Sequence, residues 1–175
     1  MSIKNLSVFF PLFNEEGNVK EDVEKAVQVL EKLKLNYEIL LINDGSSDRT
    51  GEIADNIAAG NTKVRVIHHK TNLGYGEALK SGFYNAEYDV IVYTDGDGQF
   101  DFSQVRDFLE KIEDYDLVLG YRIKRQDPFL RKLFQDIAGY DLDNRLVWIV
   151  DELVSIFLAS DVALIMKNFG RSTKQ

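Results

Sequence analysis

The stretch "YDVIVYTDGDGQFD", residues 88–101, decides the fold because an apolar run in it gives way to three aspartates, two glycines and a glutamine. A short continuous apolar run bounded by turn residues is typical of a strand that is buried on both faces. Carboxylates this close together repel one another unless a cation or a hydrogen-bond donor compensates them. We therefore expect a buried strand whose carboxyl end opens onto a binding site.

Apolar runs alternate with segments of helical periodicity on both sides of this stretch. We expect strands in residues 6–13, 37–43, 63–69, 89–94 and 116–121, and helices in residues 18–35, 49–59, 76–86 and 103–112. Five β/α alternations with short loops predict an α/β fold with a mostly parallel central sheet and helices on both faces. After residue 120 the pattern predicts a basic loop and then helical sequence, including an apolar helix over residues 146–166.

The bulk composition narrows the class of protein. A chain of 175 residues predicts one domain, residues 1–175, and its net charge of −8 argues against a nucleic-acid partner. The absence of cysteine excludes a disulfide framework and is compatible with a cytoplasmic location. The opening "MSIKNLSVFF" lacks the features of a signal peptide. The apolar run at 146–166 contains three acidic residues, which argues against a membrane-spanning helix.

A polar cluster follows each of the first four predicted strands. In open α/β sheets, ligands bind beyond the carboxyl ends of the strands. The clusters are "FNEEGN" at 13–18, "NDGSSDRT" at 43–50, "HHKTNLGYG" at 68–76 and "DGDGQFD" at 95–101. One such cluster is usually a plain turn, whereas four at the same edge predict a site.

The last of these clusters has the chemistry of a divalent-cation site. Asp95, Asp97 and Gln99 alternate along an extended segment, and oxygen ligands of this kind suit Mg²⁺ or Mn²⁺ shared with substrate phosphates. Gly96 and Gly98 permit a tight turn and a close approach by a ligand. The alternative is an Asp/Gly turn that only ends a strand.

The cluster after the second strand has two interpretations. Asp44 could accept hydrogen bonds from the edge of a nucleobase. Alternatively, the segment is a capped turn in which Ser46, Ser47 and Asp48 satisfy the start of the next helix.

The cluster after the third strand is less specific. A glycine-rich turn that opens a helix, here at Gly74, could face a phosphate group. Lys80 would be a cationic partner for that phosphate or a solvated helix charge. His68 and His69 have no further ligand cluster at metal-binding spacing, so we interpret both as ordinary loop residues.

A basic segment, "YRIKRQDPFLRK" at 121–132, interrupts an otherwise acidic chain. It is either a solvated loop or a clamp on a leaving diphosphate, an acceptor phosphate or an anionic membrane surface.

Five segments together resemble the family 2 glycosyltransferases, and most of all the branch of dolichyl- and polyprenyl-phosphate sugar synthases. They are "FFPLFNEEGNV", "YEILLINDGSSDRT", "NLGYGEALKSGF", "YTDGDGQFD" and "DLVLGYRIKR", within residues 7–131. The resemblance implies a GT-A fold that binds a UDP- or GDP-sugar with Mg²⁺ or Mn²⁺. It also implies transfer with inversion to a polyprenyl or dolichyl phosphate.

The resemblance also assigns roles to residues of this sequence. The metal ligands would be Asp95, Asp97 and Gln99, and the catalytic residues Asp97 and Arg122. The substrate-binding residues would be Pro11, Phe13, Glu15, Asp44, Ser46, Asn72, Gly74, Lys80, Asp95 and Arg125. Two positions depart from the family pattern: Phe13 replaces the commoner tyrosine, and Asn43 replaces an aspartate found in many members.

The resemblance weakens towards the C-terminus. It implies a complete donor-binding part, about residues 6–122, and an incomplete acceptor part, about residues 123–175, without the expected Asp-Cys segment. Two readings remain open. One is an active transferase, peripheral on the cytoplasmic membrane face and forming a homo-oligomer through the apolar helix at 146–166. The other is a truncated nucleotide-sugar-binding module with little or no transfer. A sugar nucleotidyltransferase is disfavoured because "PLFNEEGN" is not a Gly-rich, Arg-containing loop.

Overall fold

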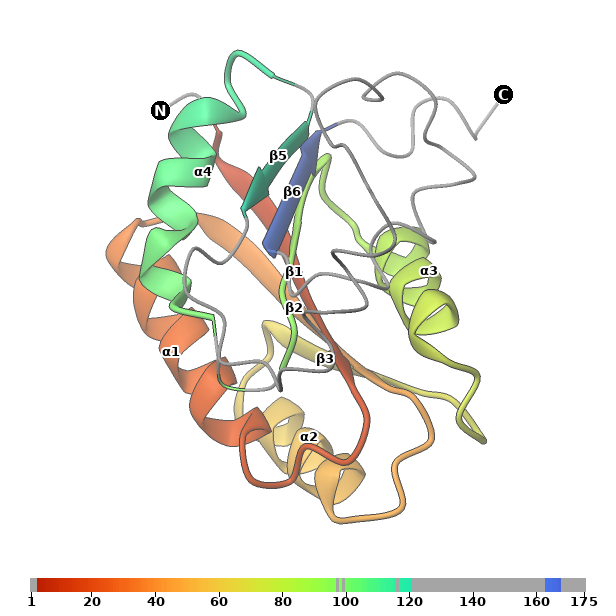
Figure 1. Ribbon diagram of the computed structural model, residues 1–175. Helices are drawn as coiled ribbons and strands as arrows, with labels where there is room; N and C mark the ends of the chain where they lie inside the picture. The colour runs from red at the N-terminus through yellow and green to blue at the C-terminus, as the bar shows by residue number, and fades with distance from the viewer. Residues whose placement is uncertain (1–2, 97, 99, 116, 121–162, 168–175) are drawn as a thin grey trace, which may run out of the picture.

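The computed structural model describes residues 3–96, 98, 100–115, 117–120 and 163–167 (Figure 1). Its strands are β1 (Asn5–Leu12), β2 (Asn36–Asn43), β3 (Val64–His68), β4 (Val90–Tyr93), β5 (Leu117–Gly120) and β6 (Ala163–Lys167). Its helices are α1 (Val19–Lys32), α2 (Thr50–Gly60), α3 (Tyr75–Asn85), the 3-10 turn η1 (Phe102–Gln104) and α4 (Val105–Lys111). The strands form one sheet in the order β3-β2-β1-β4-β6-β5.

The parallel part of the sheet is the part that the sequence predicts. β1 lies between β2 and β4, and both pairings are parallel, as is the pairing of β2 with β3. The register aligns Leu12 with Asn43 and Asn43 with His68, so these strands end at one edge. We call this edge the carboxyl rim and the opposite edge the amino rim.

The sixth strand corrects one expectation. β6 pairs antiparallel with both β4 and β5 and is the antiparallel member, among the described strands, of a sheet that is mostly parallel as expected. Residues 163–166 are therefore strand, and the apolar helix expected over 146–166 is wrong for them; residues 146–162 lie outside the described part. A short apolar run fits a buried strand as well as a helix, and periodicity alone does not distinguish the two.

The sheet separates two apolar cores because neighbouring residues of a strand point to opposite faces. On one face, Phe10, Leu41 and Val92 belong to the core covered by α1, α2 and α4. On the other face, Phe9 and Tyr93 stack with ring centroids 5.3 Å apart and pack against α3. The expected helices on both faces are confirmed (Figure 1).

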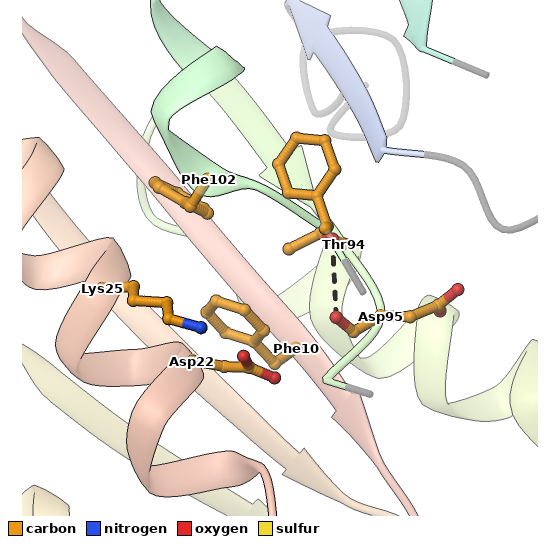
Figure 2. A pocket seen from close by; sticks show the side chains of 7 residues that line it. Phe10, Asp22, Lys25, Thr94, Asp95 and Phe102 are labelled. Atoms are coloured by element: carbon orange, nitrogen blue, oxygen red, sulfur yellow. Dashed lines mark hydrogen bonds between the residues drawn. The ribbon is translucent and has the colours of Figure 1, made fainter. Parts of the chain in front are cut away.

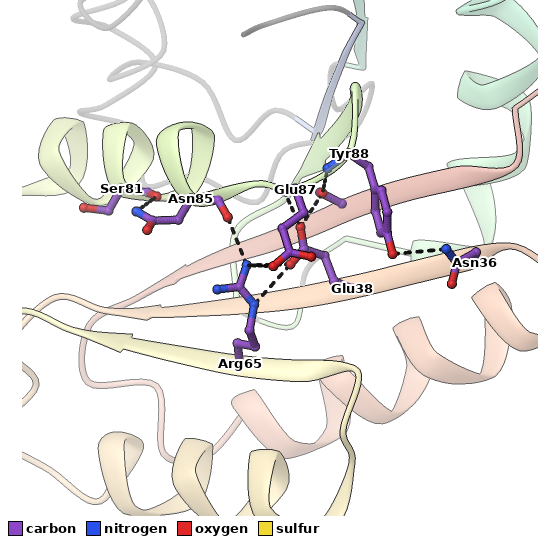
Figure 3. Close-up of polar contacts among 8 residues, drawn as sticks. Asn36, Glu38, Arg65, Ser81, Asn85, Glu87 and Tyr88 are labelled. Carbon is purple, nitrogen blue, oxygen red and sulfur yellow. Dashed lines mark hydrogen bonds and ion pairs between the residues drawn. The ribbon is translucent and has the colours of Figure 1, made fainter. Parts of the chain in front are cut away.

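The amino rim holds a dense polar network around Glu38 of β2 (Figure 3). The buried Glu38 carboxylate accepts hydrogen bonds from the Ser7 hydroxyl at 2.6 Å and from the Glu87 N–H at 2.6 Å. Arg65 donates to it from Nε at 3.2 Å and from Nη2 at 2.7 Å. The network joins β1, β2, β3 and the loop before β4, which fixes the amino ends of the parallel strands.

None of the helices in the described residues is both long enough and apolar enough to cross a membrane.

Candidate functional site

The strand order places a crevice beside β1. The chain builds β1, β2 and β3 in one direction and then returns to place β4 on the other side of β1. Ligands of open α/β sheets bind at this kind of switch point. A small pocket lies there, between β1, α1 and the segment after β4 (Figure 2). Its lining residues are Phe10, Asp22, Lys25, Thr94, Asp95, Phe100 and Phe102.

The loop after β4 is held by groups from two other elements. The Tyr75 hydroxyl, on α3, donates to Asp95 Oδ1 at 2.7 Å. On the other side, Asp22 of α1 accepts a hydrogen bond from the Gly98 N–H at 2.9 Å. Gly98 has a φ of +75°, which favours glycine, and a Cβ on Gly96 would lie 2.4 Å from Leu12 Cδ2. The loop is therefore tethered at two points and depends on its glycines.

The expected metal ligands are only partly within the described residues. Asp95 is partly buried at the rim, whereas Asp97 and Gln99 lie outside the described part. Within the described ranges, no group of three or more His, Asp or Glu side chains forms a metal cluster. A carboxylate is nonetheless a donor that Mg²⁺ and Mn²⁺ prefer, so the chemistry of Asp95 fits such a cation. The metal assignment stays a prediction.

Asp44 follows β2 and is buried, with its side chain only 4% exposed. Its Oδ1 accepts from the Leu73 N–H at 2.9 Å, and its Oδ2 accepts from the Gly74 N–H at 2.9 Å. These bonds fix the loop before α3 onto the carboxyl rim. Asp44 therefore does not cap the helix that follows it, and it lies buried at the carboxyl rim.

His69 is a member of the site that sequence reasoning missed. Its Nδ1 lies 2.6 Å from Asp44 Oδ1, its Nε2 lies 2.8 Å from Ser81 Oγ, and its side chain is 9% exposed. Because Asp44 accepts, Nδ1 carries the proton and donates. The reading as an ordinary loop residue is wrong for His69. The signal that could have found it is the pair of histidines at the end of β3, one strand away from Asp44.

His68 has a different environment. Its Nδ1 lies 2.9 Å from Asn43 Nδ2, and its Nε2 lies 2.9 Å from Asp55 at the surface. Asn43 Nδ2 is a donor, so it donates to His68 Nδ1. His68 thus connects the end of β2 with α2 and stays at the periphery of the site.

The loops after β1 and β2 are joined by several hydrogen bonds. The Asn14 N–H donates to Ser46 Oγ at 3.0 Å, and the Glu15 N–H donates to Thr50 Oγ1 at 2.7 Å. Ser46 and Ser47 therefore bind the β1 loop and do not cap α2, which corrects the capping interpretation. Asp48 does serve the helix start, because its Oδ1 accepts from the Thr50 N–H at 2.9 Å.

Asp48 has a low pKa for an aspartate. Burial raises the pKa of this carboxyl, but hydrogen bonds from Thr50 and from the Glu16 N–H together lower the pKa by more than burial raises it. The net shift of the pKa is therefore downwards. Asp48, which follows the strand end at the carboxyl rim, therefore stays ionised at neutral pH.

The segment before α3 approaches the β2 loop very closely. Gly45 has a φ of +67°, and a Cβ there would lie 2.3 Å from the Thr71 carbonyl carbon and 2.4 Å from the Asn72 nitrogen. Asn72 is exposed and accepts from the Gly74 N–H through Oδ1 at 2.9 Å. Gly74 also has a positive φ, +94°. Asn72 and Gly74 thus lie beside Asp44 at the carboxyl rim.

The remaining predicted residues are placed as follows. Pro11 is buried in β1, past the last residue of β1 that pairs with β4. The missing N–H of the proline therefore costs no hydrogen bond to β4. Phe13 is exposed at the rim. Lys80 lies on α3 and donates to Glu77 at 2.6 Å, with half of its side chain exposed. Arg122 and Arg125 lie outside the described residues.

An open α/β sheet with carboxylates on two loops beside its switch point has the architecture in which ligands bind beyond the carboxyl ends of the strands. The sequence model of "Glycosyl transferase family 2" matches residues 7–165. The chain belongs to the family 2 glycosyltransferases, and its fold is GT-A.

Individual relatives agree with this placement. The chain is 34% identical over 134 residues to an undecaprenyl-phosphate 4-deoxy-4-formamido-L-arabinose transferase of Pectobacterium carotovorum, with 75% of this chain and 41% of the relative covered. It resembles the structure of a glucosyl-3-phosphoglycerate synthase from Mycobacterium tuberculosis in complex with phosphoglyceric acid, at a TM-score of 0.62 and 22% identity, covering 94% and 57% of the two chains.

A third likeness is to the mannosyltransferase PcManGT from Pyrobaculum calidifontis, in complex with GDP-Man and Mn²⁺. The TM-score is 0.60 at 16% identity, and 78% of this chain and 39% of that chain are covered. At this level of identity the two structural likenesses show the fold alone. The chain spans less than half the length of the curated relatives it matches.

Proposed function

We propose that this chain binds a UDP- or GDP-sugar together with Mg²⁺ or Mn²⁺, and that the sugar is transferred with inversion to a polyprenyl or dolichyl phosphate. The observation that carries this proposal is the placement of Asp44 and Asp95 on two loops of the carboxyl rim, joined through residues 73–75. The family supports the transferase chemistry, and the undecaprenyl phosphate in the name of the Pectobacterium relative supports the class of acceptor.

Asp44 and its surroundings suit a nucleobase. Two large apolar side chains, Leu73 and Phe13, are exposed close to Asp44. The Leu73 N–H donates to the Asp44 carboxylate. Phe13 directly follows Leu12, whose carbonyl accepts from the Asp44 N–H. A flat base that covers these side chains would remove apolar surface from water. Its ring N–H could then donate to Asp44, since each carboxylate oxygen accepts more than one hydrogen bond.

Asp95 suits the diphosphate end of the same ligand. It lies at the switch point, beside the pocket in Figure 2, on a loop with glycines on alternate positions. A divalent cation bound there with Asp97 and Gln99 would supply charge compensation for the diphosphate that departs. Asp95 would orient the donor through that cation, and Gly96 and Gly98 would let the phosphate groups approach the backbone.

The transfer itself needs no strong protein base when the acceptor is a phosphate. An oxygen of the ionised lipid phosphate attacks the anomeric carbon, and the bond from that carbon to the donor diphosphate breaks, which releases the nucleoside diphosphate. The new bond forms on the opposite face of the sugar, so the configuration inverts. A hydroxyl acceptor would require a positioned carboxylate. We also propose that the reaction takes place at the cytoplasmic membrane face, where a polyprenyl phosphate presents its head group.

Calorimetry with UDP-, GDP- and dTDP-sugars, with and without Mn²⁺, tests the donor half of the proposal. A ligand that binds only the folded chain raises its stability by about 2.7 kcal/mol at 100 times the dissociation constant, so thermal shifts provide a second readout. Asp95→Asn removes the charge and keeps the size, and we expect it to bring the affinity in Mn²⁺ down to the affinity without the metal.

Asp89→Asn is the matched control, because Asp89 is exposed just before β4, at the opposite end of the same strand. It should bind the donor like the parent chain. Equal metal-dependent binding by Asp95→Asn and the parent would refute the metal assignment. Transfer of labelled sugar to a short polyprenyl phosphate tests the acceptor, and transfer to a free sugar hydroxyl alone would refute that part.

A further inference from the structure

A short segment of the chain contacts both carboxylates of the site. His69 and the N–H groups of Leu73 and Gly74 donate to Asp44. The next residue, Tyr75, begins α3 and donates its hydroxyl hydrogen to Asp95. Three consecutive residues, 73–75, thus span the distance between the loop after β2 and the loop after β4.

The Tyr75 hydroxyl donates to Asp95 from a ring that is held in the core. The ring packs beside Phe9 and Tyr93 in the core beneath α3. A protonated phenol 2.7 Å from a carboxylate oxygen makes a charge-assisted hydrogen bond, which is stronger than one between neutral groups.

We propose that Tyr75 is a positioning residue, which orients Asp95 for the cation and diphosphate and thereby couples that part of the site to the nucleobase part at Asp44. The inference rests on the proposed function, because it assigns both ends of one ligand to these two loops. A nucleoside held at Asp44 fixes residues 73 and 74, which places the Tyr75 hydroxyl and hence the Asp95 carboxylate. The coupling is reciprocal by thermodynamic necessity, so a cation at Asp95 tightens nucleoside binding by the same factor.

The competing explanation is that the Tyr75 hydroxyl only contributes to folding. The chain offers a variant that separates the two, because Tyr75→Phe removes one oxygen and keeps the ring in the core. A purely structural bond would lower the melting temperature and leave the metal dependence of binding as it was. A positioning bond changes the metal dependence itself.

The test measures UDP and GDP affinity by calorimetry, with and without Mn²⁺, for the parent, for Tyr75→Phe and for Tyr84→Phe. Tyr84 lies on the same helix with 67% of its surface exposed and is the matched control. We expect Tyr75→Phe to weaken binding in Mn²⁺ about 10-fold, as for loss of a hydrogen bond to a charged group, and to change binding without the metal less than about 2-fold. Tyr84→Phe should match the parent in both conditions.

A double-variant cycle identifies the residue through which Tyr75 acts. If the hydroxyl works through Asp95, Tyr75→Phe should cost nothing further in an Asp95→Asn background. A full additional 10-fold loss in that background would overturn the proposal, and so would unchanged Mn²⁺-dependent affinity in Tyr75→Phe alone. A parent chain that binds neither nucleotide in either condition would overturn the proposed function as well, and this outcome is distinct from both of the others.

Discussion

Each rim of the parallel sheet buries a carboxylate, and the two carboxylates are satisfied by different kinds of donor. At the amino rim, Glu38 binds the guanidinium of Arg65, a hydroxyl and a backbone N–H (Figure 3). At the carboxyl rim, Asp44 binds His69 and two backbone N–H groups. Within the part of the chain that the structure describes, no Lys or Arg forms an ion pair with Asp44.

This difference in donors indicates what each rim does. A buried carboxylate that is paired with a full cation has its charge neutralised inside the protein, and the pair then holds the elements together. A carboxylate held by an imidazole N–H and two backbone N–H groups, with no Lys or Arg partner among the described residues, can still accept a further donor or cation. The amino rim is therefore a structural joint, and the carboxyl rim is the side on which the proposed ligand would add the compensating charge.

The largest effect should come from Gly45→Ala at the carboxyl rim. A methyl group there meets the backbone of residues 71–72, and the positive φ of Gly45 adds strain. We expect a loss of about 3–4 kcal/mol of stability, together with loss of nucleotide binding, in chemical denaturation and calorimetry. Gly60→Ala is the control, because a Cβ on Gly60 has no atom within 4 Å, and its stability should be at least that of the parent. Wild-type binding by Gly45→Ala would show that the approach of these two loops is dispensable.

Arg65→Met should show most clearly that the two rims have different roles, because it should change stability but not nucleotide affinity. It leaves Glu38 buried without its cation, and we expect a loss of about 2–3 kcal/mol, below the full value for a buried pair because 42% of the Arg65 side chain is exposed. Nucleotide affinity should not change. Arg106→Met, which removes an exposed i,i+4 pair with Glu110, serves as the control and should be nearly neutral. A change in nucleotide affinity in Arg65→Met would contradict the division between rims.

Asp44→Asn should lower both the stability of the fold and the affinity for nucleotide. The amide nitrogen of the new side chain cannot accept, so one of the donors around it loses its partner, and we expect about 1–2 kcal/mol of destabilisation. Nucleotide affinity should fall about 10-fold or more as well. Asp55→Asn is the matched control, since Asp55 is the exposed partner of the neighbouring His68. A destabilised variant with unchanged nucleotide affinity would make Asp44 a purely structural group.

The smallest effect concerns pH. The folded pKa of Asp48 is lowered from 3.8, so its stabilisation is fully present above the unfolded pKa and is lost as the pH falls through the folded pKa. Asp48→Asn should therefore be less stable than the parent by under about 1 kcal/mol from pH 7 down to about pH 5, as for a weakened cap. The two melting curves should begin to converge only as the pH falls below 3.8, towards the lowered folded pKa of Asp48. A difference that stays constant however far the pH is lowered would assign the effect to something other than this charge.

The sequence anticipated the parallel strands and the rim because both depend on local patterns. An apolar run that ends in Asn43-Asp44 or in Asp95 marks the carboxyl end of a strand, and parallel strands bring such ends together. It did not anticipate His69 or Tyr75, because their roles depend on register and packing: His69 meets a carboxylate 25 residues away, and Tyr75 meets one 20 residues away. The paired histidines mark a position near the rim, but neither they nor a tyrosine at the start of a helix indicates which carboxylate it will meet.

The same limit explains the sixth strand. The segment 163–167 is short and mostly apolar, and its sequence alone does not indicate that it pairs antiparallel between β4 and β5. The partner of a strand is a property of the whole sheet. The assignments of Asp97, Gln99, Arg122 and Arg125 stay predictions from the family pattern.

The position of β6 also has a consequence for the order in which the sheet can assemble. Tyr93 pairs with Leu164, so β4 keeps an open edge during synthesis until a segment far along the chain has been made, and β5 cannot join without it. Chains fold as they emerge from the N-terminus, and pairings that are distant in sequence form slowly. The strands that carry Asp44 and Asp95 are the early ones. If the proposed nucleotide site forms on these strands, nucleotide would stabilise β1 to β4 in a nascent chain before the edge of β4 has its neighbour.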